Sequence, residues 1–265
     1  MFQSPSSNYD WRFRLFGVPV EVQPFFWLAG LILVGEASFK WTTAMGKMYE
    51  SIGVEYTGNG LATMLATLVV FFLSILIHEM GHVVAFRRYG IYSRIVLHGF
   101  GGVAIPSTQS SRAYRTSRWK DVIIYAAGPF FQAVFLAGLL AISLGITTLH
   151  FFPNLPFVSL APVLATFVGV DWFVVLQLMV YANLFWILFN LLPILPMDGG
   201  GICQGFCKDY YGPYQGRVTA LWISVVTAIQ VAIWLFQSEM MLLALYVGYM
   251  GFQSMSELQS GSRGY

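Results

Sequence analysis

The chain has 265 residues, of which 57% are hydrophobic and 10% are charged, and its net charge is +2. A soluble domain of this size carries about 25% charged residues, so the composition excludes an ordinary water-soluble fold. The small net charge and the lack of a basic block argue against a nucleic-acid partner. The lipid bilayer is therefore predicted to be the main solvent of this protein.

The N-terminus is predicted to be an amphipathic segment, residues 1–23, that lies on the membrane surface. It lacks the basic and apolar regions of a secretory signal. It combines aromatic and arginine residues between Trp11 and Phe16, just before a Gly-Val-Pro turn. Such a mixture is typical of interfacial segments. Residues 24–253 are then predicted to form one membrane domain, followed by a C-terminal tail, residues 254–265.

Six segments are apolar enough to be transmembrane helices, each of which needs about 20 mostly apolar residues. The fold class is therefore an all-α polytopic membrane protein with about six transmembrane helices. Residues 237–239 separate the last two, which favours a tight hairpin; one long kinked helix is the alternative. The predicted helices are Pro24–Phe39, Leu61–Phe86, Val122–Thr147, Val170–Leu192, Thr219–Phe236 and the shorter Met240–Phe252.

Basic residues indicate how these helices are oriented. If the N-terminus is cytoplasmic, the inside loops hold all of the 14 Lys and Arg residues except Lys40 and Lys47. This asymmetry agrees with the positive-inside rule. The N-terminus is therefore predicted to face the cytoplasm.

Residues 91–106 differ from both helix and ordinary loop. They are rich in β-branched residues and are divided by Gly99, Gly101 and Gly102, which predicts a β-hairpin. The segment is too apolar for water, and strands enter a membrane only beside protein or a wet cavity. We therefore expect a re-entrant β-hairpin beside the active site. Residues 151–169, with three prolines and no charge, are predicted to be an outer-face loop or a partial dip into the bilayer.

The second predicted helix ends with the sequence His78-Glu79-Met80-Gly81-His82, an HExxH motif. Residues four apart lie on one face of a helix, so both imidazoles can reach one metal ion, with Glu79 beside them. Ionisable groups are costly inside a membrane helix and are usually functional. The alternative is a pair of core histidines bonded to neighbouring carbonyl groups.

A catalytic zinc site needs a third protein ligand and an open position. Asp198 is the best candidate, because it follows the cytoplasmic end of the fourth helix, on the side where the second helix ends. Pro193 and Pro196 break the chain there and allow it to bend back. A loop aspartate that caps a turn is the alternative. The other candidates are Asp171 and Glu36, which lie on the opposite side, Asp209, and His98, for which a hairpin-tip hydrogen bond is preferred.

Cys203 and Cys207 could also hold a metal at their i,i+4 spacing, but two reduced thiols are the preferred interpretation. No other soft ligand lies nearby in the sequence.

Two motifs in this order resemble the paired signature of the site-2 protease family of intramembrane zinc metalloproteases. They are the HExxH motif and Asn190-x-x-Pro193-x4-Asp198-Gly199. The glycine-rich hairpin and Ala127-Gly128-Pro129 are also similar to that family. The match covers residues 60–205, the predicted catalytic core. It is similar to the compact six-span members, which lack a PDZ or CBS domain.

The resemblance implies one Zn²⁺ per chain, bound by His78, His82 and Asp198, with Glu79 catalytic. It implies that Asn190 contacts the substrate or the oxyanion, with an interhelical hydrogen bond as the alternative. Two positions depart from the family pattern, Gln132 where Asn is common and Gly201 where a long polar residue is common. The residues expected to contact the substrate are Gly99, Phe100, Gly101, Gly102, Val103 and Pro193.

The implied function is intramembrane proteolysis by a zinc metalloendopeptidase that cuts peptide bonds within or near the transmembrane segments of membrane-anchored substrates, as in regulated intramembrane proteolysis. The expected partners are a transmembrane protein substrate, the lipid bilayer and a regulatory membrane partner, with no nucleic acid. The compact chain predicts a prokaryotic plasma membrane, with the active site toward the cytoplasm. The rival functions are a metal transporter, which would repeat polar residues across the bilayer, and a homologue that binds membrane helices without cutting them.

Overall fold

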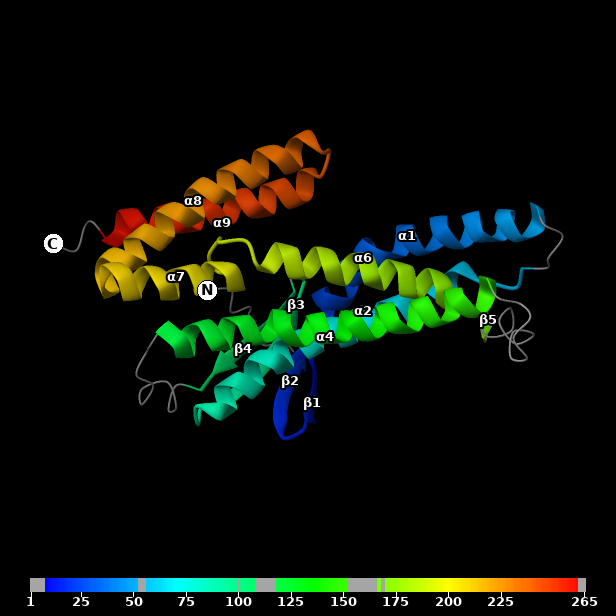
Figure 1. Cartoon of the computed structure of the whole chain (residues 1–265), viewed down its shortest axis with the longest axis horizontal. Helices are drawn as coiled ribbons and strands as arrows, with labels where there is room; N and C mark the ends of the chain where they lie inside the picture. The colour runs from blue at the N-terminus through cyan, green and yellow to red at the C-terminus, as the bar shows by residue number, and fades with distance from the viewer. Residues whose placement is uncertain are drawn as a thin grey trace.

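The computed structural model describes residues 8–51, 56–99, 101–107, 118–151, 166–167 and 170–261. The protein is mostly helical, with long helices lying side by side and a small sheet beside α2 (Figure 1). In chain order the elements are β1 (Trp11–Leu15), β2 (Val18–Val22), α1 (Pro24–Ser51), α2 (Gly60–Arg88), β3 (Ser93–His98), β4 (Gly101–Pro106), α4 (Arg118–Phe151), β5 (Thr166–Phe167), β6 (Val170–Asp171), α6 (Trp172–Asn190), α7 (Asp198–Tyr211), α8 (Pro213–Gln237) and α9 (Met241–Gly261).

Helices α2, α4 and α6 pack against one another and form the centre of the protein. Helix α1 covers α2 and α6, while α7 joins this centre to an antiparallel pair, α8 and α9 (Figure 1). Each of the six predicted helices corresponds to one of these helices. Helices α8 and α9 are separate, joined by a turn at residues 238–240, as the hairpin interpretation predicts.

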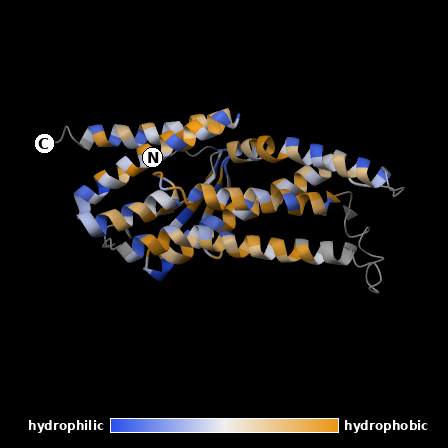
Figure 2. Cartoon of the chain, turned by 45° about the horizontal axis from the view of Figure 1, so that its top comes forward, coloured by the Kyte–Doolittle hydropathy of each residue, from blue (hydrophilic) through white to orange (hydrophobic). Residues whose placement is uncertain are grey.

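Four helices of the described chain are long and apolar enough to cross a membrane. They contain Gly60–Arg88, Trp119–Ile142, Trp172–Asn190 and Pro213–Gln237. Figure 2 shows that apolar residues dominate these helices along most of their length. This supports an integral membrane protein. Helices α1 and α9 are not among the four, so the count of six spans stays a prediction.

The small sheet has four strands in the order β1-β2-β3-β4, and β2 and β3 are parallel. The hairpin predicted at residues 91–106 is present as β3 and β4, whereas its re-entry into the membrane stays a prediction. The predicted N-terminal segment contains two further strands, β1 and β2. Apolar residues alternate with polar ones in both strands. One face of β2 is buried, whereas every residue of β1 is exposed or half-buried.

Three other segments refine the sequence-based description. Residues 198–211 form a helix, α7, directly after the predicted bend. Helix α9 continues to Gly261, so most of the predicted tail is helical. The prediction for residues 151–169 falls mainly on residues outside the described part of the chain, apart from the end of α4 and strand β5.

Candidate metal centre

The two histidines of the HExxH motif lie near the C-terminal end of α2. This helix is capped at its start by Asn59, whose side chain accepts from the backbone N–H groups of Leu61 and Ala62. One helical turn separates His78 from His82, so their rings face the same side. The two Nε2 atoms are 3.2 Å apart, and both side chains are buried.

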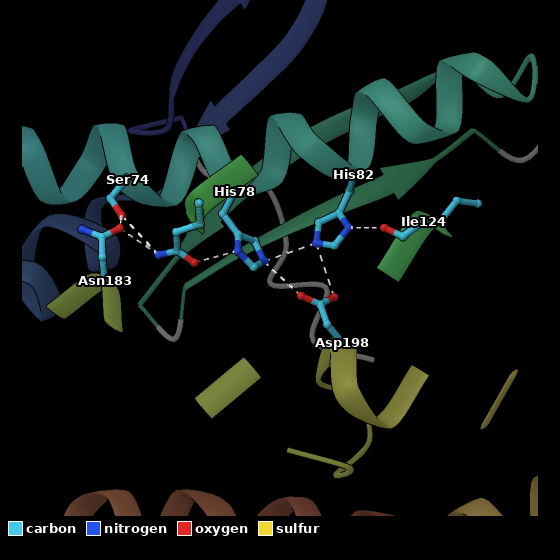
Figure 3. A network of polar contacts seen from close by, with 7 residues as sticks. Ser74, His78, His82, Ile124, Asn183 and Asp198 are labelled. Atoms are coloured by element: carbon cyan, nitrogen blue, oxygen red, sulfur yellow. Dashed lines mark hydrogen bonds and ion pairs between the residues drawn. The ribbon is translucent and has the colours of Figure 1, made fainter. Parts of the chain in front are cut away.

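Asp198 reaches this pair from the start of α7 (Figure 3). One carboxylate oxygen lies 3.1 Å from Nε2 of His78, and the other lies 3.3 Å from Nε2 of His82. The turn before Asp198 is anchored to α8 (Pro213–Gln237), because the Leu195 N–H donates to the Ser224 hydroxyl at 2.7 Å. The predicted convergence of these side chains is therefore present in the structure.

These groups suit a bound cation. Oδ2 of Asp198 is buried and accepts no hydrogen bond from the described residues. Burial by itself raises the pKa of Asp198, but the two neighbouring imidazoles lower it overall, so the carboxylate is ionised as a metal ligand must be. Two nitrogens and a carboxylate, with ligand atoms within 4.8 Å of one another, form a donor set that Zn²⁺ prefers.

Gly128 on α4 keeps the space beside the imidazoles open. A Cβ at this position would collide with Nε2 of His82 and would lie 2.8 Å from Nε2 of His78. The Gly128-Pro129 element therefore has a spatial role, since any side chain at Gly128 would fill the space beside the two Nε2 atoms.

The far nitrogen of each imidazole meets a fixed partner. Nδ1 of His82 lies 2.7 Å from the backbone carbonyl of Ile124, and Nδ1 of His78 lies 2.9 Å from the side-chain oxygen of Gln132 (Figure 3). A carbonyl oxygen only accepts, so Nδ1 of His82 carries a proton, and in the neutral ring the Nε2 lone pair then faces Asp198. This is the arrangement found around metal-binding histidines.

Glu79 lies between the two histidines in the sequence and is buried. Strand β4 passes directly beside it. A Cβ on Gly102 would lie 2.7 Å from a Glu79 carboxylate oxygen, and the Ala104 backbone N–H donates to the same carboxylate. The hairpin therefore lies next to the acidic residue of the motif.

Within the described part of the chain, the residues predicted to contact the substrate make no hydrogen bond or ion pair with the two histidines or Asp198. Gly101 has φ +121°, a conformation that glycine adopts readily, and packs against Trp186 of α6. Gly99 packs against Phe25, and Val103 is exposed. Phe100 lies outside the described residues. Pro193 lies in the turn between α6 and α7.

Asn190 is the last residue of α6 and is half-buried. Among the described residues it makes no hydrogen bond with the two histidines or Asp198. Its predicted contact with the substrate or the oxyanion is therefore a matter for experiment.

The rejected ligand candidates lie apart from this centre. Asp171 caps the start of α6, Glu36 pairs with Lys40 at 2.5 Å on α1, and His98 ends β3 opposite Gly101. In the described part of the chain, His78, His82 and Asp198 are the one group of three side chains that could hold a metal. The Sγ atoms of Cys203 and Cys207 are 4.0 Å apart, and burial together with the neighbouring thiol raises the pKa of Cys203 to about 11, which favours two reduced thiols.

Sequence reasoning missed the residues that support the centre. Gln132, Asn183 and Ser74 form a buried polar group behind His78, and Ser224 anchors the turn before Asp198. The presence of Gln132 where Asn is common could have indicated this contact, because the longer Gln side chain reaches farther than Asn. Gly201, the second departure, lies against the ring of Tyr125, which fills the space that a longer side chain would need.

The sequence model of peptidase family M50 matches residues 66–233, which is more than half of the chain. The matched region contains the HExxH motif, Gly128, Gln132, and Asp198. It therefore includes every side chain of the metal centre.

A curated relative and a solved structure, both from Methanocaldococcus jannaschii, illustrate this relationship. Zinc metalloprotease MJ0392 is 25% identical over 207 residues, which cover 77% of this chain and 48% of the relative. The chain spans about half the length of the curated relatives that it matches. A solved structure, the Site-2 Protease from the same organism, covers 93% of this chain and 95% of its own, with a TM-score of 0.54 and 22% identity. That likeness supports the fold alone.

Proposed function

The chain belongs to peptidase family M50, the family of the site-2 proteases, and from this premise we propose that it is an intramembrane zinc metalloprotease of the HExxH type. The observation that carries the proposal is the convergence of His78, His82 and Asp198 next to Glu79. The substrates are membrane-anchored proteins, cut within or near their transmembrane segments, as in regulated intramembrane proteolysis.

One Zn²⁺ per chain is held by the two histidines and Asp198. Three protein ligands leave an open position, as catalytic zinc sites require. When bound, zinc supplies a Lewis acid that makes water a better nucleophile and polarises the scissile carbonyl group.

Glu79 is the general base and then the general acid. It accepts a proton from the attacking water as the new carbon–oxygen bond forms, and it passes that proton to the amine as the carbon–nitrogen bond breaks. Its burial beside β4 keeps it away from bulk water. Asn190 is proposed to assist by contacting the substrate or the oxyanion.

The hairpin of β3 and β4 is proposed to bind the substrate. A helical substrate hides its carbonyl groups in its own hydrogen bonds, so it must unwind before it is cut. Strand β4 lies at the edge of the sheet, and its Ala104 N–H points toward Glu79. An unwound segment that pairs with this edge would pass the catalytic residues, in the manner of β-augmentation.

The substrate-binding residues proposed here are residues 99–103 together with Pro193. A proline at Val103 would disturb the edge, so Val103→Pro should remove cleavage while zinc remains bound. Full cleavage by a folded Val103→Pro protein would contradict pairing at this edge. The residues concerned are Gly99, Phe100, Gly101, Gly102, Val103 and Pro193.

The arrangement in the membrane is also part of the proposal. Six helices within residues 24–253 span the bilayer, the hairpin at residues 91–106 re-enters it, and residues 1–23 lie at its surface. The distribution of the basic residues supports a cytoplasmic N-terminus and a cytoplasmic zinc site, and the membrane is proposed to be a prokaryotic plasma membrane.

The test compares the wild-type protein with Glu79→Gln in detergent. We expect about one zinc per chain in both proteins and cleavage of a model transmembrane substrate by the wild type only. General acid–base catalysis contributes about 10²–10⁴-fold, so the variant should fall by at least that factor. Equal cleavage by both proteins would exclude Glu79 as the base, and the absence of zinc from both would exclude the metal centre.

A further inference from the structure

A chain of buried hydrogen bonds runs from His78 through three helices (Figure 3). Oε1 of Gln132, on α4, lies 2.9 Å from Nδ1 of His78. The Gln132 side-chain NH₂ group lies 3.2 Å from the hydroxyl of Ser74, on α2, and 3.1 Å from Oδ1 of Asn183, on α6. Asn183 and Gln132 are 1% and 0% exposed, so these contacts are shielded from bulk water.

The donor and acceptor of each hydrogen bond in this network follow from the contact at its far end, between Asn183 and Met179. The backbone carbonyl of Met179 can only accept, so the Asn183 group 2.8 Å from it is the NH₂ group. Oδ1 of Asn183 therefore faces Ser74 and Gln132, and it accepts from both. The NH₂ group of Gln132 must point to Oδ1 of Asn183, which turns its Oε1 toward His78.

This direction decides which nitrogen of His78 is protonated. Because Oε1 of Gln132 only accepts, Nδ1 of His78 must carry the proton. In the neutral ring Nε2 is then unprotonated, and its lone pair points to Asp198, 3.1 Å away. The reversed amide of either side chain would place oxygen against oxygen, or NH₂ against NH₂, within the apolar centre of the helices.

We propose that Gln132 is a positioning residue that holds His78 in the tautomer able to bind metal, and that Asn183 and Ser74 set the orientation of its amide. This inference rests on the proposed function for the identity of the metal. Such a network is costly to bury unless every group is paired, and here every group is paired. It also explains why the longer Gln side chain stands at this position, since it connects His78 with both α2 and α6.

The experiment measures metal binding rather than cleavage. The full chain is purified in detergent, stripped with a chelator, and titrated with Zn²⁺ against a competing chelator and with Co²⁺ while the visible absorption is recorded. The variants are Gln132→Met, which keeps the length of the side chain but offers only a weak acceptor, Asn183→Leu, and the double variant. The matched control is Thr67→Val, a fully buried position of α2 whose hydroxyl bonds only to the backbone of Thr63 at 2.7 Å.

Gln132→Met should weaken zinc binding about 10–100-fold and change the Co²⁺ absorption. Asn183→Leu should have a smaller effect in the same direction, because it acts through Gln132. The double variant should bind zinc no more weakly than Gln132→Met, since both changes break one chain. Thr67→Val should bind like the wild type.

The outcomes separate the two proposals. If the wild type binds neither metal, the proposed function fails, and the inference fails with it. If the wild type binds zinc and a folded Gln132→Met protein binds it equally well, with the same Co²⁺ absorption, only the inference fails. Losses of affinity that follow the thermal stability of the metal-free variants, the control included, would reduce Gln132 to a packing residue. If Gln132→Met does not fold, Asn183→Leu provides the test. Unchanged zinc affinity in a folded Asn183→Leu protein would overturn the proposal that Asn183 orients the Gln132 amide.

Discussion

Two buried aspartates at the starts of two helices show how differently this protein uses the same side chain. Asp171 caps α6, and each of its oxygens has a fixed donor, the Val174 N–H at 3.0 Å and the Tyr56 hydroxyl at 2.6 Å. Asp198 begins α7, and its Oδ2 accepts no hydrogen bond from any described residue. Both are buried, at 2% and 8% exposure.

The difference separates a structural carboxylate from a ligand. A buried carboxylate is costly unless its lone pairs are satisfied, and the donors around Asp171 satisfy them. The atoms that face Asp198 are Nε2 of His78 and Nε2 of His82. In the neutral His82 ring Nε2 presents a lone pair, because Nδ1–H donates to the Ile124 carbonyl. Lone pairs that converge in this way suit a cation bound between them. The sequence offered both residues as ligand candidates, and their partners now distinguish them.

The largest expected effect tests this difference directly. Metal that binds only the folded state stabilises it by about 4 kcal/mol at a concentration 1,000 times the Kd. Asp198→Asn should lose zinc binding, and with it this stabilisation and cleavage. Asp171→Asn should still bind zinc and should still be stabilised by it. Thermal unfolding in detergent, with zinc or with a chelator, measures the effect. An Asp171→Asn protein whose thermal stability no longer responds to zinc would contradict the assignment of Asp171 as a purely structural carboxylate.

A second prediction concerns the space that the ligands leave open. Gly128→Ala puts a methyl group against both Nε2 atoms, so zinc affinity should fall at least about 100-fold, equivalent to about 2.7 kcal/mol. Gly138, on the same helix, has no atom within 4 Å of an added Cβ. Gly138→Ala should therefore leave zinc binding unchanged. Competition with a chelator measures both affinities, and equal binding by both variants would mean that the ion does not occupy this space.

The centre was predictable where its residues are close in sequence or share one end of the helices. The i,i+4 spacing in α2 places His78 beside His82 whatever the rest of the chain does, and the helix ends bring Asp198 to the same side. The sequence suggested Gln132 only as a helix-packing residue, and its contacts with His78 and Asn183 were not predicted, because they depend on the rotation of α4 and α6 about their axes. A sequence pattern of uniformly apolar helices does not determine that rotation.

The elements outside the helical centre were predictable to different degrees. The hairpin at residues 91–106 followed from its glycines and β-branched residues. Strands β1 and β2 were missed, although Trp11–Leu15 and Val18–Val22 alternate apolar and polar residues, because the aromatic and arginine residues also suit an interfacial segment. Helix α7 begins with three glycines after Asp198, which disfavour a helix by propensity. Tertiary packing outweighs this cost, since a Cβ on Gly199 or Gly200 would collide with the backbone of the preceding turn.

The smallest effect is expected at the Asp171 end and addresses its structural role. Burial and the hydrogen bond to Asp171 raise the pKa of Tyr56, so its hydroxyl stays protonated and donates over the ordinary pH range. Tyr56→Phe removes this donor and leaves a buried carboxylate oxygen unpaired, which should lower the free energy of unfolding by about 1–2 kcal/mol. Zinc affinity and cleavage should not change.

Tyr49 provides the matched control, because its ring stacks on Tyr56 at 5.6 Å and the substitution Tyr49→Phe leaves both the stacking and the Asp171 bond in place. Its effect on unfolding should lie within about 0.5 kcal/mol of zero. Denaturation in detergent of the metal-free proteins isolates this contribution from that of zinc. A Tyr56→Phe protein with lower zinc affinity would mean that the two ends of the helical centre are coupled, and Asp171 would then share in the function rather than only hold the start of α6.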